Sequence, residues 1–294
     1  MINSIYLGPK NLEEGLKILS QNNGSIKILA GGSDLLNRIR SGKKHVEILL
    51  DASSFCLEYI REQGGDLVIG AMTKLSMVED SVLLEQEPLA ILRESAGQVG
   101  GWQTRNLATI GGNICTGNSS SDMAVALLAL DAKLRLVSLK GERVIPIDEF
   151  FIAPRKVDVR EDEILKEIII GKFSNAKGWG SHFVKFGKRK SNCIATVNAG
   201  AVLGINNNTR KISAVRIAMG TVAPTPVRLY KTEKFLENRI FSQSVIDEAV
   251  KVMEKEISPR TSFRATKEFR EDIARVFFNR AVQKSGEKAL GGIV

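Results

Sequence analysis

The chain has 294 residues, more than one average domain, and its 43% hydrophobic and 26% charged residues are typical of a globular protein. Three distant cysteines and two histidines argue against a disulfide framework, a four-cysteine iron–sulfur cluster and a histidine-rich metal site. The net charge of +9 is spread along the chain and aromatic residues make up only 6%, so we expect no nucleic-acid partner.

The first 54 residues predict a small β-α-β unit. Asn11 is a plausible N-cap for an amphipathic helix that ends near residues 22–24. A strand over 26–30, a short helix over 34–42 and a strand over 46–53 follow. A glycine pair falls at the carboxyl end of the first of these strands, which is where α/β sheets usually bind ligands.

Residues 55–177 predict a mixed sheet with helices packed on it. A hairpin turns at Gly64–Gly65, and Thr73 is expected to cap a helical region that runs to about Gly97 with an interruption at Pro88. The later elements are a helix over 121–131 and strands over 132–138, 143–148 and 163–171.

Residues 178–294 predict a separate unit in which strands precede helices, the pattern of an α+β domain. The expected strands cover 181–186, 195–205 and 212–220, and the expected helices cover 230–238, 243–257 and 265–285. The predicted fold class is therefore α+β, in three parts over 1–54, 55–177 and 178–294. No apolar run is long enough for a membrane span and the N-terminus lacks signal-peptide features, so we expect a cytoplasmic protein.

Two glycine pairs are the main candidate functional motifs. "ILAGGSDL" and "ATIGGNICTGNSSSD" each lead from an apolar, strand-like run into Gly-Gly and then small polar residues. Such a turn lets the backbone approach an anion closely with its N–H groups free, which favours a phosphate ligand. Two simple tight turns are the alternative for each stretch taken alone. Neither motif is a Walker A loop or a GxGxxG fingerprint.

Asp122 has two interpretations from its position at the start of a predicted helix. Its carboxylate could cap backbone N–H groups, or it could accept a hydrogen bond from a ribose hydroxyl or a ring N–H of a ligand. Considered by itself, the residue favours the capping role. Both histidines are interpreted as structural, and there is no GxSxG nucleophile motif.

Taken together, the two motifs resemble those of the FAD-binding subunit of the molybdenum hydroxylases, the xanthine dehydrogenase and aerobic carbon monoxide dehydrogenase family. The likeness covers nearly the whole chain, including "DEILKEIII" and "FVKFGKRKSNCIATV". It implies FAD as the cofactor, a molybdopterin-binding large subunit and a [2Fe–2S] small subunit as partners, and electron flow through FAD to NAD⁺ or another acceptor. The alternatives are a free-standing flavin oxidoreductase and a basic partner- or nucleic-acid-binding module without a cofactor.

The resemblance also implies which residues bind FAD. The first motif would wrap the pyrophosphate with Ile28, Leu29, Ala30, Gly31, Gly32, Ser33, Asp34 and Leu35. The second would complete the site with Thr109, Gly111, Gly112, Asn113 and Thr116. Asp122 would contact the flavin or its ribityl chain, Leu165 would pack by the adenine or the ring, and Lys185 would neutralise nearby charge.

Two further implications concern the flavin ring. Val99 falls where the family often has a larger apolar or aromatic residue beside the isoalloxazine. The loop over 186–194 corresponds to one near the flavin face, where the basic run Lys185–Lys190 could favour an anionic acceptor such as NAD⁺ or could simply be a solvated surface.

Overall fold

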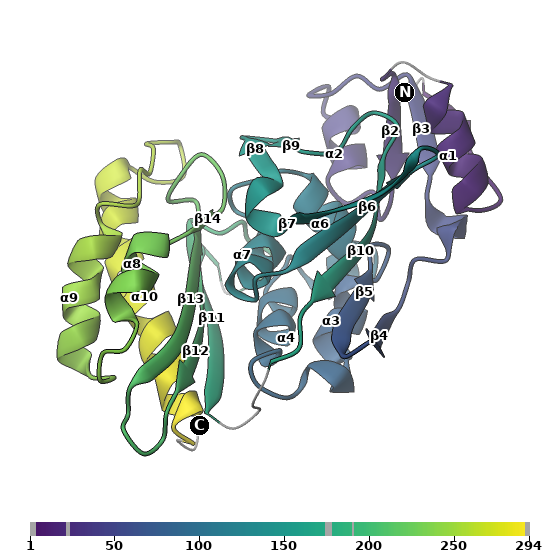
Figure 1. Ribbon diagram of the computed structural model, residues 1–294. Coiled ribbons are helices and arrows are strands. Elements are labelled where there is room, and N and C mark those ends of the chain that lie inside the picture. Colours follow the sequence, from purple (N-terminus) through teal and green to yellow (C-terminus); the bar gives the residue numbers. More distant parts are fainter. Residues whose placement is uncertain (1–3, 22–23, 174–177, 190, 292–294) are drawn as a thin grey trace.

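The N-terminal unit of the protein is a three-stranded parallel sheet with two helices. The computed structural model describes residues 4–21, 24–173, 178–189 and 191–291 (Figure 1). The elements of this unit are β1 (Ile5–Leu7), α1 (Leu12–Ser20), β2 (Ile26–Leu29), α2 (Leu35–Arg40) and β3 (Ile48–Asp51), with strand order β1-β3-β2. Asn11 caps α1 as predicted, because its side chain accepts from the Glu14 N–H at 2.9 Å. The predicted end of this helix includes residues 22–23, which lie outside the described residues.

The second sheet has five strands, and all of its described pairings are antiparallel. Its strands are β4 (Ile60–Gln63), β5 (Asp66–Gly70), β6 (Lys133–Ser138), β7 (Gly141–Pro146) and β10 (Ile164–Ile170), in the order β4-β5-β10-β6-β7. The expectation of a mixed sheet is therefore wrong in this detail, because β10 enters between β5 and β6 and runs opposite to both. The hairpin at Gly64–Gly65 is confirmed, and a small hairpin is formed by β8 (Phe151–Ala153) and β9 (Lys156–Val157).

Short helices connect β5 to β6. They are α3 (Leu75–Asp80), α4 (Ala90–Gly97), α5 (Trp102–Arg105), α6 (Ile110–Cys115) and α7 (Asp122–Ala129), and single 3₁₀ turns lie at η1 (Ser53–Phe55), η2 (Val82–Leu84) and η3 (Ile147–Glu149). The prediction that Thr73 caps the first helix is wrong. Lys74 occupies the N-cap position, and the Thr73 hydroxyl instead bonds to both the N–H and the carbonyl of Tyr59 at 3.0 and 2.9 Å.

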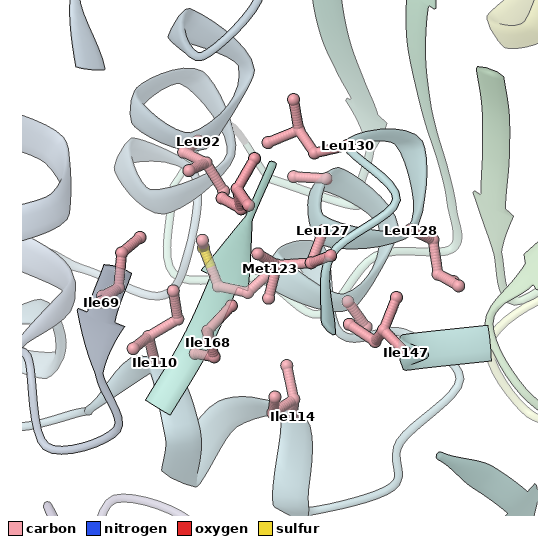
Figure 2. Packing of buried hydrophobic residues seen from close by; sticks show 14 of the residues in the cluster. Ile69, Leu92, Ile110, Ile114, Met123, Leu127, Leu128, Leu130, Ile147 and Ile168 are labelled. Atoms are coloured by element: carbon pink, nitrogen blue, oxygen red, sulfur yellow. The ribbon is translucent and has the colours of Figure 1, made fainter. Parts of the chain in front are cut away.

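Helix α7 is buried on every side. All eight of its residues are buried, as expected for a helix that is apolar around its whole circumference. Figure 2 shows Met123 of α7 among Leu92 of α4, Ile110 of α6 and Ile168 of β10. On its other side α7 contacts β12 and β13 of the third sheet. The start of α7, where Asp122 lies, is thus held by packing from both parts of the protein.

The C-terminal unit is an antiparallel sheet with helices on one face, and it confirms the α+β fold class. Its strands are β11 (Trp179–Phe186), β12 (Val197–Ile205), β13 (Ile212–Gly220) and β14 (Val227–Arg228), in sequential order. Helices α8 (Tyr230–Leu236), α9 (Gln243–Met253) and α10 (Lys267–Ala289) cover the face opposite α7 (Figure 1). The division of the chain at 54/55 and 177/178 stays a prediction.

A cluster of charged side chains joins the C-terminal unit to α4. Lys288 Nζ of α10 lies 2.7 Å from Glu94 Oε1 and 2.9 Å from Glu87 Oε1. His182 Nδ1 of β11 lies 3.0 Å from Glu94 Oε2, and this oxygen accepts a hydrogen bond from the Phe183 N–H at 2.8 Å. His182 therefore has a structural position, in agreement with its interpretation from the sequence.

We expect Glu94→Gln to weaken this junction in a pH-dependent way. Burial opposes the charged form, but the contacts with His182 and Lys288 hold the pKa of Glu94 below its ordinary value of 4.5. The carboxylate thus adds stability above that value, and this contribution is lost as the pH falls through the lower folded-state pKa. At pH 7 the variant should lose about 1–3 kcal/mol of unfolding free energy, the usual loss for hydrogen bonds to a charged group.

Urea unfolding at several pH values measures this loss. The difference between wild type and Glu94→Gln should shrink below the ordinary carboxyl pKa, whereas Glu62→Gln, at an exposed position of β4, should show no comparable difference. If Glu94→Gln loses the same unfolding free energy at every pH, including pH values below the carboxyl pKa, the charge of Glu94 has no role in stability.

Candidate functional site

The first glycine pair forms a tight turn directly after β2. Gly32 has φ +68°, a conformation that side chains with a Cβ rarely adopt. A Cβ on Gly31 would lie 1.7 Å from the carbonyl oxygen of Leu107, so only glycine fits there. The N–H groups of Gly31, Gly32 and Ser33 have no hydrogen-bond acceptor among the described residues. The turn thus presents three backbone donors, as an anion site requires.

Positive side chains surround this turn. Arg155 Nη1 lies 3.6 Å and Arg38 Nη1 lies 4.0 Å from Asp34 Oδ2. Burial lowers the pKa of Lys44, and the charges of Lys27 and Arg38 lower it further. The sequence analysis missed these cations. Arg38 and Lys44 could have been noticed from their nearness to the motif, but Arg155 is brought in by the fold from more than a hundred residues away.

The second glycine pair is not a turn after a strand. It lies in the first turn of α6, where the Thr109 hydroxyl accepts from the Gly112 N–H at 3.0 Å and caps the helix. The Gly111 N–H donates to the Ala71 carbonyl at 2.9 Å. The expectation of free backbone donors at this second pair is therefore wrong, because the helix cap uses the Gly112 N–H and Ala71 uses the Gly111 N–H. The glycines serve close packing instead, since a Cβ on Gly111 would lie 2.6 Å from Ala71 O.

The two motifs nevertheless lie side by side, and hydrogen bonds connect the second motif to Ser121 at the start of α7. An ideal Cβ on Gly112 would lie 3.7 Å from Ala30 Cβ of the first motif. Asn113 Oδ1 accepts from the Ser121 hydroxyl at 2.5 Å, and the Thr116 hydroxyl donates to the Asn113 carbonyl at 2.8 Å. The predicted residues of the first and second motifs are thus brought to one place.

Asp122 is not the cap of α7, because Ser121 has that role through a 3.2 Å bond from the Ala124 N–H. Instead the Asp122 carboxylate accepts from Lys185 Nζ at 2.6 Å and from Asn198 Nδ2 at 2.7 Å. The Asp122 and Lys185 side chains are only 5% and 4% exposed. Burial raises the pKa of Asp122, against the opposing effect of the Lys185 charge and the two hydrogen bonds. The capping interpretation is therefore wrong, and a buried ion pair takes its place.

Asn198 is a site residue that the sequence analysis missed. Its side chain is completely buried, and its Oδ1 has no hydrogen-bond partner among the described residues. This oxygen packs against the backbone of β13, because an ideal Cβ on Gly220 would lie 2.1 Å from it, and the role of Asn198 in the site is its bond to Asp122. A single polar residue within the apolar run of β12 is the signal that could have identified it.

A cavity of about 440 Å³ lies beside the buried ion pair. Its lining residues are Gln98, Lys185, Phe186, Gly187, Lys188, Arg189 and Cys193. Lys185 Nζ also donates to the Gln98 carbonyl at 2.7 Å, so the residue that pairs with Asp122 is bonded to a second residue of the cavity lining. The basic loop singled out in the sequence thus forms one wall of a cavity, although its Lys190 lies outside the described residues.

Two of the predicted site residues, Val99 and Leu165, are not among the residues that line the cavity. Val99 follows α4, is half-buried against the core, and accepts from Arg105 Nη1 through its carbonyl at 3.4 Å. Leu165 is 5% exposed in β10, at an irregularity in the pairing with β6. Contacts of these two side chains with a cofactor stay predictions.

The residues present fit a flavin dinucleotide. The turn at Gly31–Ser33 supplies backbone donors for a pyrophosphate that have no acceptor among the described residues. Over the ranges that the structure covers, no group of three or more His, Cys, Asp or Glu side chains is arranged to hold a metal ion.

Comparison with known families decides the assignment. Residues 2–172 match the family described as the FAD binding domain in molybdopterin dehydrogenase. Residues 182–285 match the CO dehydrogenase flavoprotein C-terminal domain. The chain belongs to the FAD-binding subunits of the molybdenum hydroxylases. The resemblance stated from the two motifs is thereby confirmed, with FAD as the cofactor and an oxidoreductase subunit as the class.

Individual relatives agree along nearly the whole chain. The xanthine dehydrogenase FAD-binding subunit of Escherichia coli O157:H7 is 31% identical over 97% of both chains. The carbon monoxide dehydrogenase medium chain of Hydrogenophaga pseudoflava is 30% identical over 94% of this chain and 95% of its own. A solved structure of carbon monoxide dehydrogenase from that organism superposes with a TM-score of 0.91 at 28% identity, covering 96% of this chain and 97% of its own. In the described part of the flavoprotein chain, no helix has the length and apolar character to cross a membrane.

Proposed function

We propose that this flavoprotein subunit passes electrons from the iron–sulfur clusters of a small partner subunit through FAD to NAD⁺. A large partner subunit would carry the molybdopterin and the substrate. Support comes from relatives that are named as FAD-binding subunits or medium chains of xanthine and carbon monoxide dehydrogenases. The observation that carries the acceptor assignment is the basic cavity beside the buried Asp122–Lys185 pair.

The cofactor would lie along the line of contacts that joins the two glycine motifs to this cavity. The N–H groups at Gly31–Ser33 would bind the pyrophosphate, with Arg38 and Arg155 close by. Asn113 and Asp122 would follow along the cofactor, and the ring would reach the cavity wall at Lys185. When bound, FAD supplies the redox chemistry, since none of these side chains can carry electrons. The chain's own residues bind it, orient it and set the local charge.

The lining of the cavity also bears on the type of reaction. Its described residues include two lysines and an arginine but no carboxylate or histidine. A free-standing flavin oxidoreductase would need a base beside its own substrate. The cavity instead favours an anionic electron acceptor, which needs positive charge and access to the ring.

We further propose a cytoplasmic complex, because the free thiols of Cys56, Cys115 and Cys193 fit a reducing compartment.

Anaerobic mixing with NADH tests the acceptor assignment on the FAD-loaded chain. NADH should bleach the flavin, at a rate that falls as the ionic strength rises because steering by charge is screened. Combining Lys188→Ala with Arg189→Ala should slow bleaching by about tenfold at low salt, the lower end of electrostatic effects on association. Lys251→Ala on α9 removes a lysine outside the cavity lining and should leave the rate unchanged.

Two results would contradict the proposal in different ways. If the bleaching rate changes neither with the salt concentration nor in the loop variants, the basic wall has no electrostatic role. An absence of bleaching in the FAD-loaded chain would remove NAD⁺ as the acceptor.

A further inference from the structure

Three arginines gather where the chain enters α10, on the C-terminal unit. Arg270 is in the first turns of α10, and Arg260 and Arg264 belong to the loop before it. Arg270 is only 6% exposed. Its η nitrogens donate to the Thr196 carbonyl at 2.5 Å and to the Ser262 hydroxyl at 3.0 Å. Its Nε is buried and has no hydrogen-bond partner among the described residues.

The charge of this cluster is not balanced by the described part of the chain. No carboxylate there lies within salt-bridge distance of Arg260, Arg264 or Arg270. Burial, and then the positive charges of Arg260 and Arg264, lower the pKa of Arg270. A guanidinium nevertheless stays protonated at any physiological pH. A buried cation with only neutral partners is costly, so a counter-charge from outside the chain would stabilise the fold here.

We propose that the cluster formed by Arg260, Arg264 and Arg270 binds an oxyanion of the phosphate class. Guanidinium groups present paired donors that match phosphate oxygens. Arg260 and Arg264 lie close enough to Arg270 for their charges to act on it. Arg264 lies over the exposed ring of Phe263, 4.5 Å from its centroid, so its guanidinium is held at the surface where a ligand can reach it. The buried charge of Arg270 lies beneath and adds attraction without contact.

The cluster lies near the cavity loop. The Thr196 carbonyl that accepts from Arg270 belongs to a residue whose N–H donates to Phe186 O at 2.7 Å. The rings of Phe186 and Phe269 meet at 5.7 Å between centroids. The bound oxyanion is either free phosphate or a phosphate group of a nucleotide that extends along this loop.

Calorimetric melting of the FAD-saturated chain tests the site with inorganic pyrophosphate and ADP at constant ionic strength. FAD saturation keeps both probes out of the cofactor's own site. Both probes should raise the melting temperature of the wild type, because a ligand bound only to the folded state stabilises it. Arg260→Ala and Arg264→Ala should each weaken the apparent affinity by about tenfold, the loss for one charge-assisted contact.

Arg280→Ala provides the matched control, because it removes one exposed positive charge farther along α10. Its response to both probes should equal that of the wild type. A larger shift with ADP than with pyrophosphate identifies a nucleotide, and an equal or smaller shift identifies the phosphate group alone. The proposal is overturned if neither probe raises the melting temperature, or if Arg280→Ala loses the response as fully as Arg264→Ala.

Discussion

Gly31→Ala is expected to reduce FAD affinity by at least about a hundredfold, the effect of roughly 3 kcal/mol of overpacking. The added Cβ would lie 1.7 Å from Leu107 O, and neither backbone can yield without moving the turn away from the second motif. A displaced turn would no longer hold the N–H groups of Gly31, Gly32 and Ser33 in place for the pyrophosphate. Titration with FAD, with circular dichroism to verify folding, measures the effect.

Two control variants separate the site from a general cost of replacing glycine. Gly171→Ala adds a Cβ that meets nothing within 4 Å and should bind FAD normally. Gly32 and Gly42 share nearly the same φ, +68° and +69°, but only Gly32 lies in the motif. Alanine at Gly32 should therefore weaken FAD binding, whereas alanine at Gly42 should cost only backbone strain. Unchanged FAD affinity in both Gly31→Ala and Gly32→Ala would show that the turn is not the site.

Asp122→Asn is expected to cost about 3–5 kcal/mol of stability, the usual loss when one partner of a buried ion pair is removed. The substitution leaves the Lys185 ammonium buried with only neutral oxygens around it. Lys185→Met should be costly for the converse reason, because it leaves the carboxylate with Asn198 alone. Urea unfolding of the FAD-free chain measures both losses.

The double variant tests whether the two charges act as a pair. Asp122→Asn combined with Lys185→Met should be clearly less destabilising than the sum of the single changes, since neither charge is then left alone. If the loss of unfolding free energy in the double variant equals the sum of the two single losses, the two charges do not act as a pair. Repeating the unfolding with excess FAD shows whether Asp122 also contacts the cofactor, because a ligand contact makes the loss larger when FAD is present.

The local elements could be predicted from the sequence where one signal dominated. The β-α-β unit followed from apolar runs bounded by glycine, and the cap at Asn11 followed from its side-chain chemistry. The antiparallel sheet was harder, since the neighbours of β10 depend on pairing between strands far apart in the chain. The same limit applies to Thr73, whose hydroxyl is used by Tyr59 across a sheet edge.

The candidate site could be predicted only in part from the sequence, for the same reason. Both glycine pairs look alike in the sequence, but within the described ranges only the N–H groups of the first pair lack an acceptor. Those of the second pair donate to Thr109 and to Ala71. Family resemblance indicated Asp122 and Lys185 separately. Their pairing, and the part played by Asn198, depend on where β11 and β12 lie against α7.

A crystal structure of the FAD-loaded chain tests most directly the claim that the cofactor extends from the first glycine turn to the basic cavity. We expect the pyrophosphate oxygens about 3 Å from the N–H groups of Gly31, Gly32 and Ser33, at ordinary hydrogen-bond distance. The isoalloxazine should lie at the wall of the cavity lined by Lys185, Lys188 and Arg189, beside the Asp122–Lys185 pair. A pyrophosphate bound elsewhere, or a ring remote from Lys185, would contradict the account.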